Sequence, residues 1–167
     1  MIQQEVLFTE DQRFRQWWLW LIILGADAVF LFWVCKQIMF KAQIGGYPIS
    51  DSVWLASGVG IILTNVLLFY ARLSTQIKKD GIYLKFFPFQ WSYKYYNWDM
   101  IDKCYVRTYN PLGEYGGWGV RYSMSGQGMA YNVSGNKGLQ LELNNHKKVL
   151  IGTNKSTELE EVLTKLK

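Results

Sequence analysis

The chain has 167 residues, a hydrophobic content of 50% and a formal net charge of +5. Its length allows one ordinary domain, but the apolar residues gather in the first half. The one histidine, His146, argues against a histidine-based triad and a zinc site, and the two cysteines give no sign of a disulfide framework.

Two long apolar runs stand in the first half of the chain. Residues 17–35 contain a single side chain that is charged at neutral pH in water, Asp27, and residues 53–71 contain none. Nineteen such residues in a helix are enough to cross the hydrocarbon core of a bilayer. The sequence therefore predicts a transmembrane hairpin, with spans at about residues 17–36 and 53–72.

The first span is expected to be a retained helix that starts before the membrane. Thr9 and Gln12 have the spacing of a capping box, which predicts about eight helical residues ahead of the apolar run. A cleaved signal peptide is the competing interpretation. The flanking acidic residues and the lack of a small-residue cleavage site after Phe40 argue against it.

Basic residues near the span ends predict the orientation. Cytoplasmic flanks carry the excess of lysine and arginine, and here the outer flanks hold six against two in the connecting segment. We therefore expect a multi-pass protein of the cell membrane with both termini in the cytoplasm. The six are Arg13, Arg15, Arg72, Lys78, Lys79 and Lys85, and the two are Lys36 and Lys41.

The acid inside the first span needs a partner. In an antiparallel hairpin, Asp27 and Asn65 lie about one helical turn apart in depth, so a hydrogen bond between them is expected to fasten the two helices, worth about 1 kcal/mol or less. The alternative is a function for Asp27 in an accessory subunit of a transport or enzyme complex. Ala56 and Gly60 give the second span a small face for close helix contact or oligomerisation.

From Leu73 the pattern changes to short strands between turn signals. The alternation of Leu139, Leu141 and Leu143 with polar residues is typical of a half-buried strand. The last residues carry one apolar stripe on an amphipathic helix that includes Leu159 and Leu163. Seven strands are predicted, at about residues 73–79, 82–87, 101–109, 120–123, 129–133, 139–143 and 149–152.

This order of strands and helix is similar to that of a pleckstrin-homology (PH) domain. Short motifs carry the resemblance: Asp80-Gly81-Ile82, Trp98-Asp99-Met100-Ile101 and Ile151-Gly152-Thr153. The chain resembles the bacterial PH-like integral membrane proteins of uncharacterised function. The resemblance implies an α+β membrane protein: an N-terminal segment with the transmembrane hairpin over 1–72, then a PH-like domain over 73–167. That domain would be a seven-stranded antiparallel barrel or sandwich with a C-terminal helix.

No reactive constellation is found in the sequence. The glycine clusters lack the spacing of a phosphate-binding loop, and Asp99, Asp102 and Glu114 lack the spacing of a metal site. We therefore expect no enzyme activity, no cofactor, no metal and no nucleic-acid partner.

Two groups of residues are candidates for binding. Residues 73–167 hold thirteen basic against eight acidic side chains, and anionic lipid would attract each basic group near the bilayer by about 1 kcal/mol. In PH domains, basic residues around the first hairpin bind phosphoinositides, and Lys79 with Lys85 is similar to that arrangement without its arginine. A strand running outward would place Asp80 about 20 Å from the bilayer, which counts against headgroup contact. The lysines are Lys78, Lys79, Lys85 and Lys94.

The aromatic residues between 86 and 98 exceed what one strand can bury. They predict packing at the core and the bilayer interface, or a surface for a protein partner or a second copy. The candidate surface comprises Phe89, Trp91, Tyr93 and Tyr95. The hypothesis that follows is a membrane-anchored, non-enzymatic binding module whose partners are the lipid bilayer and a protein or its own copies.

Overall fold

The computed structural model describes residues 5–40, 50–123 and 126–166. Two compact units form the chain. The hairpin unit is Arg15–Tyr70, and the β unit combines the described residues up to Phe14 with the chain from Ala71 onward. The boundary predicted at residue 72 therefore misses that the N-terminal segment belongs to the β unit.

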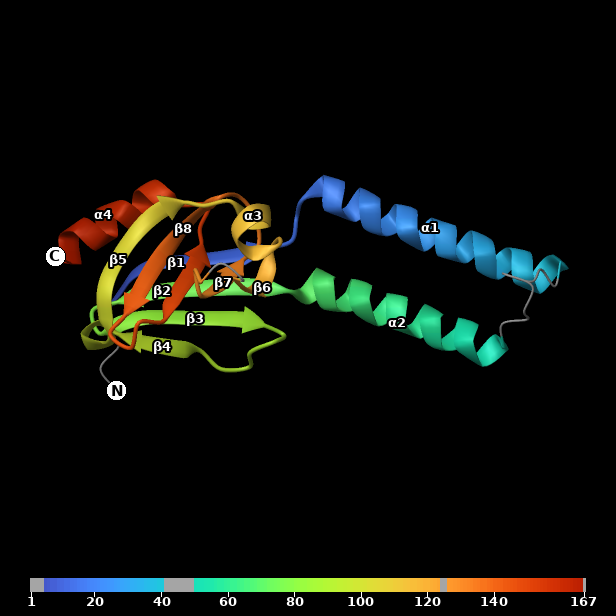
Figure 1. Cartoon of the computed structure of the whole chain (residues 1–167), viewed down its shortest axis with the longest axis horizontal. Coiled ribbons are helices and arrows are strands. Elements are labelled where there is room, and N and C mark those ends of the chain that lie inside the picture. The colour runs from blue at the N-terminus through green and yellow to red at the C-terminus, as the bar shows by residue number, and fades with distance from the viewer. Residues whose placement is uncertain (1–4, 41–49, 124–125, 167) are drawn as a thin grey trace. The chain divides into compact units, whose positions relative to one another are not determined.

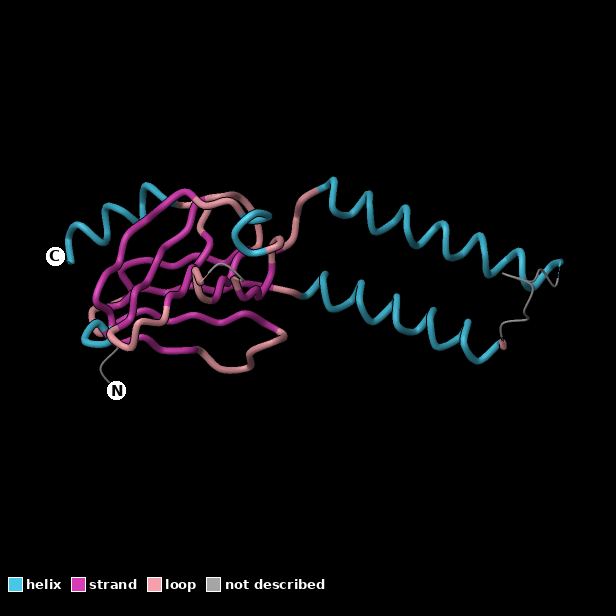
Figure 2. Tube along the Cα trace, in the orientation of Figure 1, coloured by secondary structure: helices cyan, strands magenta, loops and turns pink. Residues whose placement is uncertain are grey.

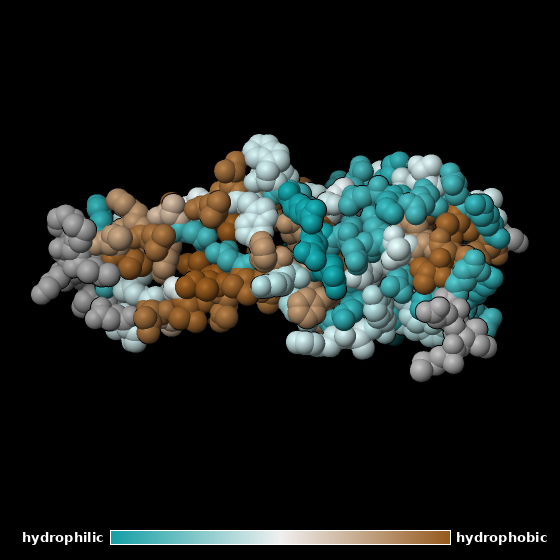
Figure 3. All heavy atoms as spheres, turned by 180° about the vertical axis from the view of Figure 1, so that it is seen from behind, coloured by the Kyte–Doolittle hydropathy of each residue, from teal (hydrophilic) through white to brown (hydrophobic). Residues whose placement is uncertain are grey.

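The hairpin unit consists of α1 (Trp17–Phe40) and α2 (Asp51–Tyr70), which run side by side in opposite directions (Figure 1). Ring contacts between Trp20 and Phe69 and between Phe30 and Trp54 join the helices near both ends. In the described part of the chain, these two helices are long and apolar enough to cross a membrane. Apolar side chains, brown in Figure 3, make up much of the surface of the two helices, as expected for helices that face lipid.

The N-terminal segment forms a strand, so the predicted capping-box helix at Thr9 is wrong. Strand β1 (Val6–Arg13) pairs antiparallel with β2 (Arg72–Lys78). Phe8, Glu10 and Gln12 are buried while their neighbours are exposed, which is the period of a strand. The polar Glu10 and Gln12 hide that period because they point inward to polar partners.

The first sheet has the order β1-β2-β3-β4, and all of its pairs are antiparallel. Strand β3 (Gly81–Phe87) follows β2 through a tight turn, and the short β4 (Lys94–Asn97) is the edge strand. The predicted pattern contained no strand at β4, because four largely exposed residues carry little periodic signal.

The second sheet has the order β5-β8-β9-β7-β6. Its strands pair antiparallel except for the parallel pair β7–β9. Among the described residues, two sheets with four and five strands thus replace the predicted seven-stranded antiparallel barrel or sandwich, and no closed barrel forms. The bounds are β5 Ile101–Thr108, β6 Gly119–Tyr122, β7 Met129–Asn132, β8 Lys137–Leu143 and β9 Lys148–Gly152.

The core lies between the two sheets (Figure 2). Leu73, Leu84 and Phe86 from the first sheet and Leu139 and Leu141 from the second are fully buried. The predicted C-terminal helix is confirmed as α4 (Ser156–Leu166), which buries Leu159 and Leu163 against this core. The α+β class predicted from the sequence is confirmed.

Two short helical turns connect strands. The 3-10 turn η1 (Trp98–Met100) leads into β5, and α3 (Pro111–Tyr115) follows β5. Asn110 caps α3 by accepting a hydrogen bond from the Gly113 amide. Gly116 ends α3 in the left-handed conformation, with φ of 69°, which glycine adopts without strain.

Candidate functional site

Asp27 and Asn65 meet across the hairpin unit. The Asn65 Nδ2 donates a hydrogen bond of 2.8 Å to the Asp27 Oδ2. Both side chains are half-buried at the floor of a groove of about 390 Å³. The groove is otherwise lined by apolar, small and hydroxyl-bearing residues, among them Ser57, Gly60 and Thr64. The two residues predicted to lie within about one helical turn of each other in depth are thus brought together.

The four lysines do not converge on one place. Lys79 forms an ion pair of 2.7 Å with Glu5, and the Lys94 ammonium donates a hydrogen bond of 2.6 Å to the Tyr131 hydroxyl. Lys78 and Lys85 instead lie on the outer face of the first sheet. A single headgroup site built from all four is therefore not present.

On that outer face, two lysines and three tyrosines form what we call the tyrosine–lysine face. The ammonium of Lys78 lies 4.5 Å from the centre of the Tyr83 ring, and that of Lys85 lies 5.7 Å from the Tyr93 ring. The Tyr83 ring is 4.8 Å from that of Tyr95 and 6.5 Å from that of Tyr93. The face is defined by Lys78, Tyr83, Lys85, Tyr93 and Tyr95.

Asp80 fixes the tyrosines at one end of this face. The Tyr83 hydroxyl donates a hydrogen bond of 2.6 Å to the Asp80 carboxylate, and the Tyr95 hydroxyl donates to the Asp80 backbone carbonyl at 2.9 Å. The hydrogen bond to the carboxylate raises the pKa of Tyr83 to about 12, so the phenol is neutral at physiological pH. The face therefore presents neutral aromatic rings beneath two cations.

Phe89 and Trp91 follow the end of β3 and are the most exposed of the predicted aromatic residues. They lie in the connection between β3 and β4, where their side chains are 60% and 80% exposed. The Phe89 ring contacts Phe86, and the Trp91 ring contacts Phe87 edge-on at 5.5 Å. Trp91 thus packs on Phe87, which lies on the same face of β3 as Tyr83 and Lys85.

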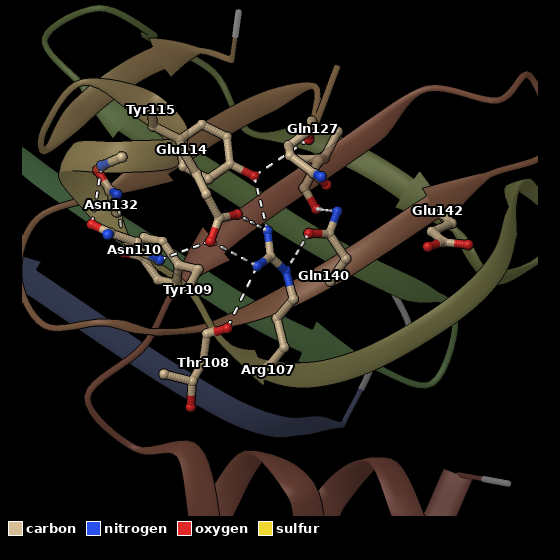
Figure 4. A network of polar contacts seen from close by, with 12 residues as sticks. Arg107, Thr108, Tyr109, Asn110, Glu114, Tyr115, Gln127, Asn132, Gln140 and Glu142 are labelled. Carbon is tan, nitrogen blue, oxygen red and sulfur yellow. Dashed lines mark hydrogen bonds and ion pairs between the residues drawn. The ribbon is translucent and has the colours of Figure 1, made fainter. Parts of the chain in front are cut away.

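Sequence reasoning missed a polar network centred on Arg107 of β5 (Figure 4). Its Nη2 lies 2.7 Å from the Glu114 carboxylate of α3, and its Nε donates to Gln140 of β8 at 2.9 Å. The remaining guanidinium hydrogens reach Glu114, the Tyr115 hydroxyl and the Thr108 carbonyl. All five donors of the arginine are thus engaged within the protein, which makes the network a structural fastening for α3.

Glu114 also accepts a hydrogen bond of 2.8 Å from the Asn110 amide. The hydrogen bond from Arg107 holds the pKa of Glu114 below its ordinary value of 4.5. Asn110 caps the short helix and Glu114, within its last turn, bonds back to the Asn110 amide; Asn110-Pro111 followed by an acidic residue is the sequence signal that could have identified the helix. Glu114 is therefore a capping and ion-pairing group.

Comparison with known families adds one finding. The model of a family of unknown function, DUF6141, matches residues 3–165. The chain belongs to this family. The match covers the hairpin unit and the β unit of the DUF6141 chain alike, so both are parts of the family's architecture. The searches of curated proteins and of solved structures gave no match.

Proposed function

We propose that this chain is a membrane-anchored, non-enzymatic binding module. In this proposal α1 and α2 span the cell membrane with both termini in the cytoplasm, and the β unit binds a protein at the inner face. The length and apolar character of the two helices support the anchor. The excess of basic residues outside the connecting segment supports the orientation.

We also propose a relation to PH-like domains at the level of architecture. Two packed sheets followed by a C-terminal helix support it. The added strand β1 and the parallel pair β7–β9 depart from the antiparallel order that such a domain has. Because related architectures serve many functions, the proposed binding rests on the surface of this chain.

The tyrosine–lysine face carries the proposal. It lies beside β4, an edge strand that pairs with β3 on one side within the described chain. An edge strand can accept an extended segment of another protein through main-chain hydrogen bonds. Lys78 and Lys85 would favour acidic side chains on that segment. The proposed ligand is therefore an acidic, extended segment of a partner protein.

A crosslinking experiment on the full chain in its membrane tests this. A photoreactive amino acid at Tyr93 should form an adduct with a partner that has an acidic segment, identified by mass spectrometry. The double charge reversal Lys78→Glu with Lys85→Glu should abolish the adduct. The matched control, Lys137→Glu with Lys147→Glu, reverses two exposed lysines elsewhere and should leave it unchanged.

Three outcomes would contradict the proposed ligand. These are an adduct that survives the reversal at Lys78 and Lys85, an adduct only with other copies of the chain, and an adduct only with lipid. Crosslinking between copies would instead support self-association through the same face.

The Asp27–Asn65 pair favours a second candidate function, an accessory subunit of a transport or enzyme complex. A carboxyl group inside a span is costly and often functional. Under this alternative, Asp27→Asn abolishes the activity of the complex although the protein remains inserted and folded. Under the binding-module proposal the same variant retains function, because asparagine can still hydrogen-bond to Asn65.

A further inference from the structure

One end of the β unit connects to both membrane helices. Arg13 of β1 pairs with Arg72 of β2, which pairs with Phe87 of β3, so these three residues mark the same end of the first sheet. Residues 14–16 lead from this end to α1, and Ala71 alone leads from α2. We call it the connection end.

Three large apolar side chains are exposed at the connection end. Phe89 and Trp91 follow Phe87 by two and four residues, and Leu112 of α3 is 66% exposed. Figure 1 shows α3 at the same end of the β unit as the start of β2 and the end of β3. Such a group of exposed apolar residues marks an interaction surface.

Hydrogen bonds between the sheets support this placement of α3. Gln12, next to Arg13, donates a hydrogen bond of 2.6 Å to the Gly152 carbonyl. Gly152 pairs with Gly138, which pairs with Arg107 near the end of β5. The end of β5, from which the chain leads into α3, therefore lies at the same end of the β unit as the end of β1, two strands across the second sheet from Gly152.

The structure holds Leu112 in its exposed position. Pro111 and Tyr115 of α3 are buried, and the Arg107–Glu114 ion pair fastens the helix to the second sheet (Figure 4). Leu112 is the apolar residue of this turn that faces outward. Because the turn is held in this way, the Leu112 side chain stays exposed and can insert into a neighbouring apolar layer.

We propose that Phe89, Trp91 and Leu112 insert into the interfacial layer of the bilayer and seat the β unit on it. The bilayer is the proposed binding surface because the chain passes from this end into the two helices through short connections. One residue separates β2 from α2, and three separate β1 from α1. Tryptophan is enriched at membrane interfaces. Arg13, Arg15 and Arg72 at the same end would attract anionic headgroups.

This surface adjoins the Lys85 end of the tyrosine–lysine face, because Lys85 precedes Phe87 by two residues on β3, and it differs from the lysine contact predicted from the sequence. Lys78 and Lys79 lie at the opposite end of β2 from Arg72, so they are far from the connection end along the strand. The proposal requires that α1 and α2 span the bilayer, but it does not require a protein partner. Seating would restrict the orientations in which the β unit meets other molecules.

Spin labels on the full chain in vesicles test the proposal. With Cys35 and Cys104 replaced by alanine, single cysteines at positions 89, 91 and 112 would carry a nitroxide, with position 145 as the control. Asn145 is exposed in the turn after β8, at the opposite end of the second sheet from the end of β5. The vesicles would contain phosphatidylethanolamine and about a third phosphatidylglycerol, at high lipid excess so that chains are dilute.

Labels at 91 and 112 should collide more with oxygen, which concentrates in lipid, than with a water-soluble nickel chelate, and the label at 145 should show the reverse. Equal nickel accessibility at 91, 112 and 145 would overturn the proposal. Protection of 91 and 112 from both reagents would also overturn it, because that pattern indicates a protein contact. Circular dichroism spectra that match the unlabelled chain would show that each labelled protein is folded.

Discussion

At the scale of single residues, the Asp27–Asn65 hydrogen bond lets an acid reside in an apolar helix. If α1 and α2 span a bilayer as proposed, lipid offers the carboxyl group no hydrogen-bond donor, and the neighbouring helix must supply one. Asn65 does so at 2.8 Å. The bond also fixes which faces of the two helices meet.

A double-mutant cycle measures this contribution. Asp27→Ala and Asn65→Ala should each destabilise the hairpin, and their coupling free energy should be about 0.5–1 kcal/mol, the usual range for such bonds between membrane helices. The measurement is reversible unfolding of the reconstituted protein by increasing mole fractions of dodecyl sulfate. A coupling of zero would mean that the two side chains act independently.

Glu114 gives a prediction about pH. Replacing Glu114 with glutamine removes the charge that Arg107 faces, which should cost about 1–2 kcal/mol at pH 7, the value for a charged hydrogen bond reduced by partial exposure. Thermal unfolding of the full chain in detergent, followed by circular dichroism in the strand region, measures it. Glu142→Gln, at a carboxylate whose ion pair with the exposed Lys103 is 3.7 Å long, is the control and should cost less.

The pH dependence of that difference follows from the lowered pKa of Glu114. A carboxyl group whose pKa is lower when folded contributes stability above its unfolded pKa of about 4.5 and loses it as the pH falls through the folded pKa. The stabilities of the wild type and of Glu114→Gln should therefore converge as the pH falls below 4.5. A difference that stays constant from pH 7 to pH 3 would contradict the ion pair.

At the scale of elements, β1 joins the two sheets through buried polar contacts. The Glu10 carboxylate accepts hydrogen bonds from the Thr153 hydroxyl at 2.6 Å and from the Asn154 amide at 2.8 Å. These contacts hold the segment that leads into α4. A strand that contributes polar groups to the interior is stabilised by specific partners as well as by apolar burial.

Glu10→Ala should therefore destabilise the β unit by about 2–3 kcal/mol, because the buried Thr153 hydroxyl loses the acceptor for its hydrogen and the Asn154 amide loses its acceptor. Asp11→Ala changes the exposed neighbour and should shift stability by less than about 0.5 kcal/mol. Thermal unfolding compares the two variants, and hydrogen exchange at Asn154 reports the local contact. Equal effects of the two substitutions would contradict a strand at this position.

Two glycines in the connection from β6 to β7 form a matched pair. Gly126 and Gly128 both have positive φ, of 80° and 77°. A Cβ at Gly128 would lie 2.0 Å from the Lys148 carbonyl oxygen, whereas a Cβ at Gly126 would meet open space. Both alanine variants incur the backbone strain of about 1–2 kcal/mol.

Gly128→Ala should therefore cost clearly more than Gly126→Ala, by about 2 kcal/mol or more in the free energy of unfolding, because the clash is with backbone. Chemical denaturation of the two variants tests the difference. Similar stabilities would mean that the β7–β9 contact can shift to make room.

Hydrophobic period and turn residues predict much of the fold. Asp80-Gly81 places the turn between β2 and β3, and the leucine alternation from Leu139 places β8. The strand β1 was missed because Glu10 and Gln12 occupy its inward positions, and β4 because it is short and exposed. The parallel pair β7–β9 could not be predicted, since a sequence pattern does not state which strands become neighbours.

The candidate sites also differ in how far the sequence predicts them. Helix depth alone was enough to place Asp27 beside Asn65. The tyrosine–lysine face needed the register of β2, β3 and β4, because its residues come from three strands. The engagement of Arg107 with Glu114 and Gln140 likewise depends on which strand lies next to β5.

At the scale of the whole molecule, the chain combines an apolar hairpin with a β unit that holds most of the charge. The N-terminal strand pairs with the strand that follows the second helix, so the hairpin is an insertion between β1 and β2. If α1 and α2 cross the membrane, the segment before α1 and the residues after α2 therefore lie on the same side of it. Finding the side on which the β unit lies therefore decides the orientation of the chain in the membrane.

Cysteine accessibility in intact cells measures on which side of the membrane the β unit lies. In the background without Cys35 and Cys104, Ser50→Cys at the start of α2 should react with a membrane-impermeant maleimide from outside. Asn145→Cys in the β unit should react only after the cells are permeabilised. Labelling of Asn145→Cys in intact cells, with Ser50→Cys protected, would place the β unit outside and contradict a cytoplasmic binding module.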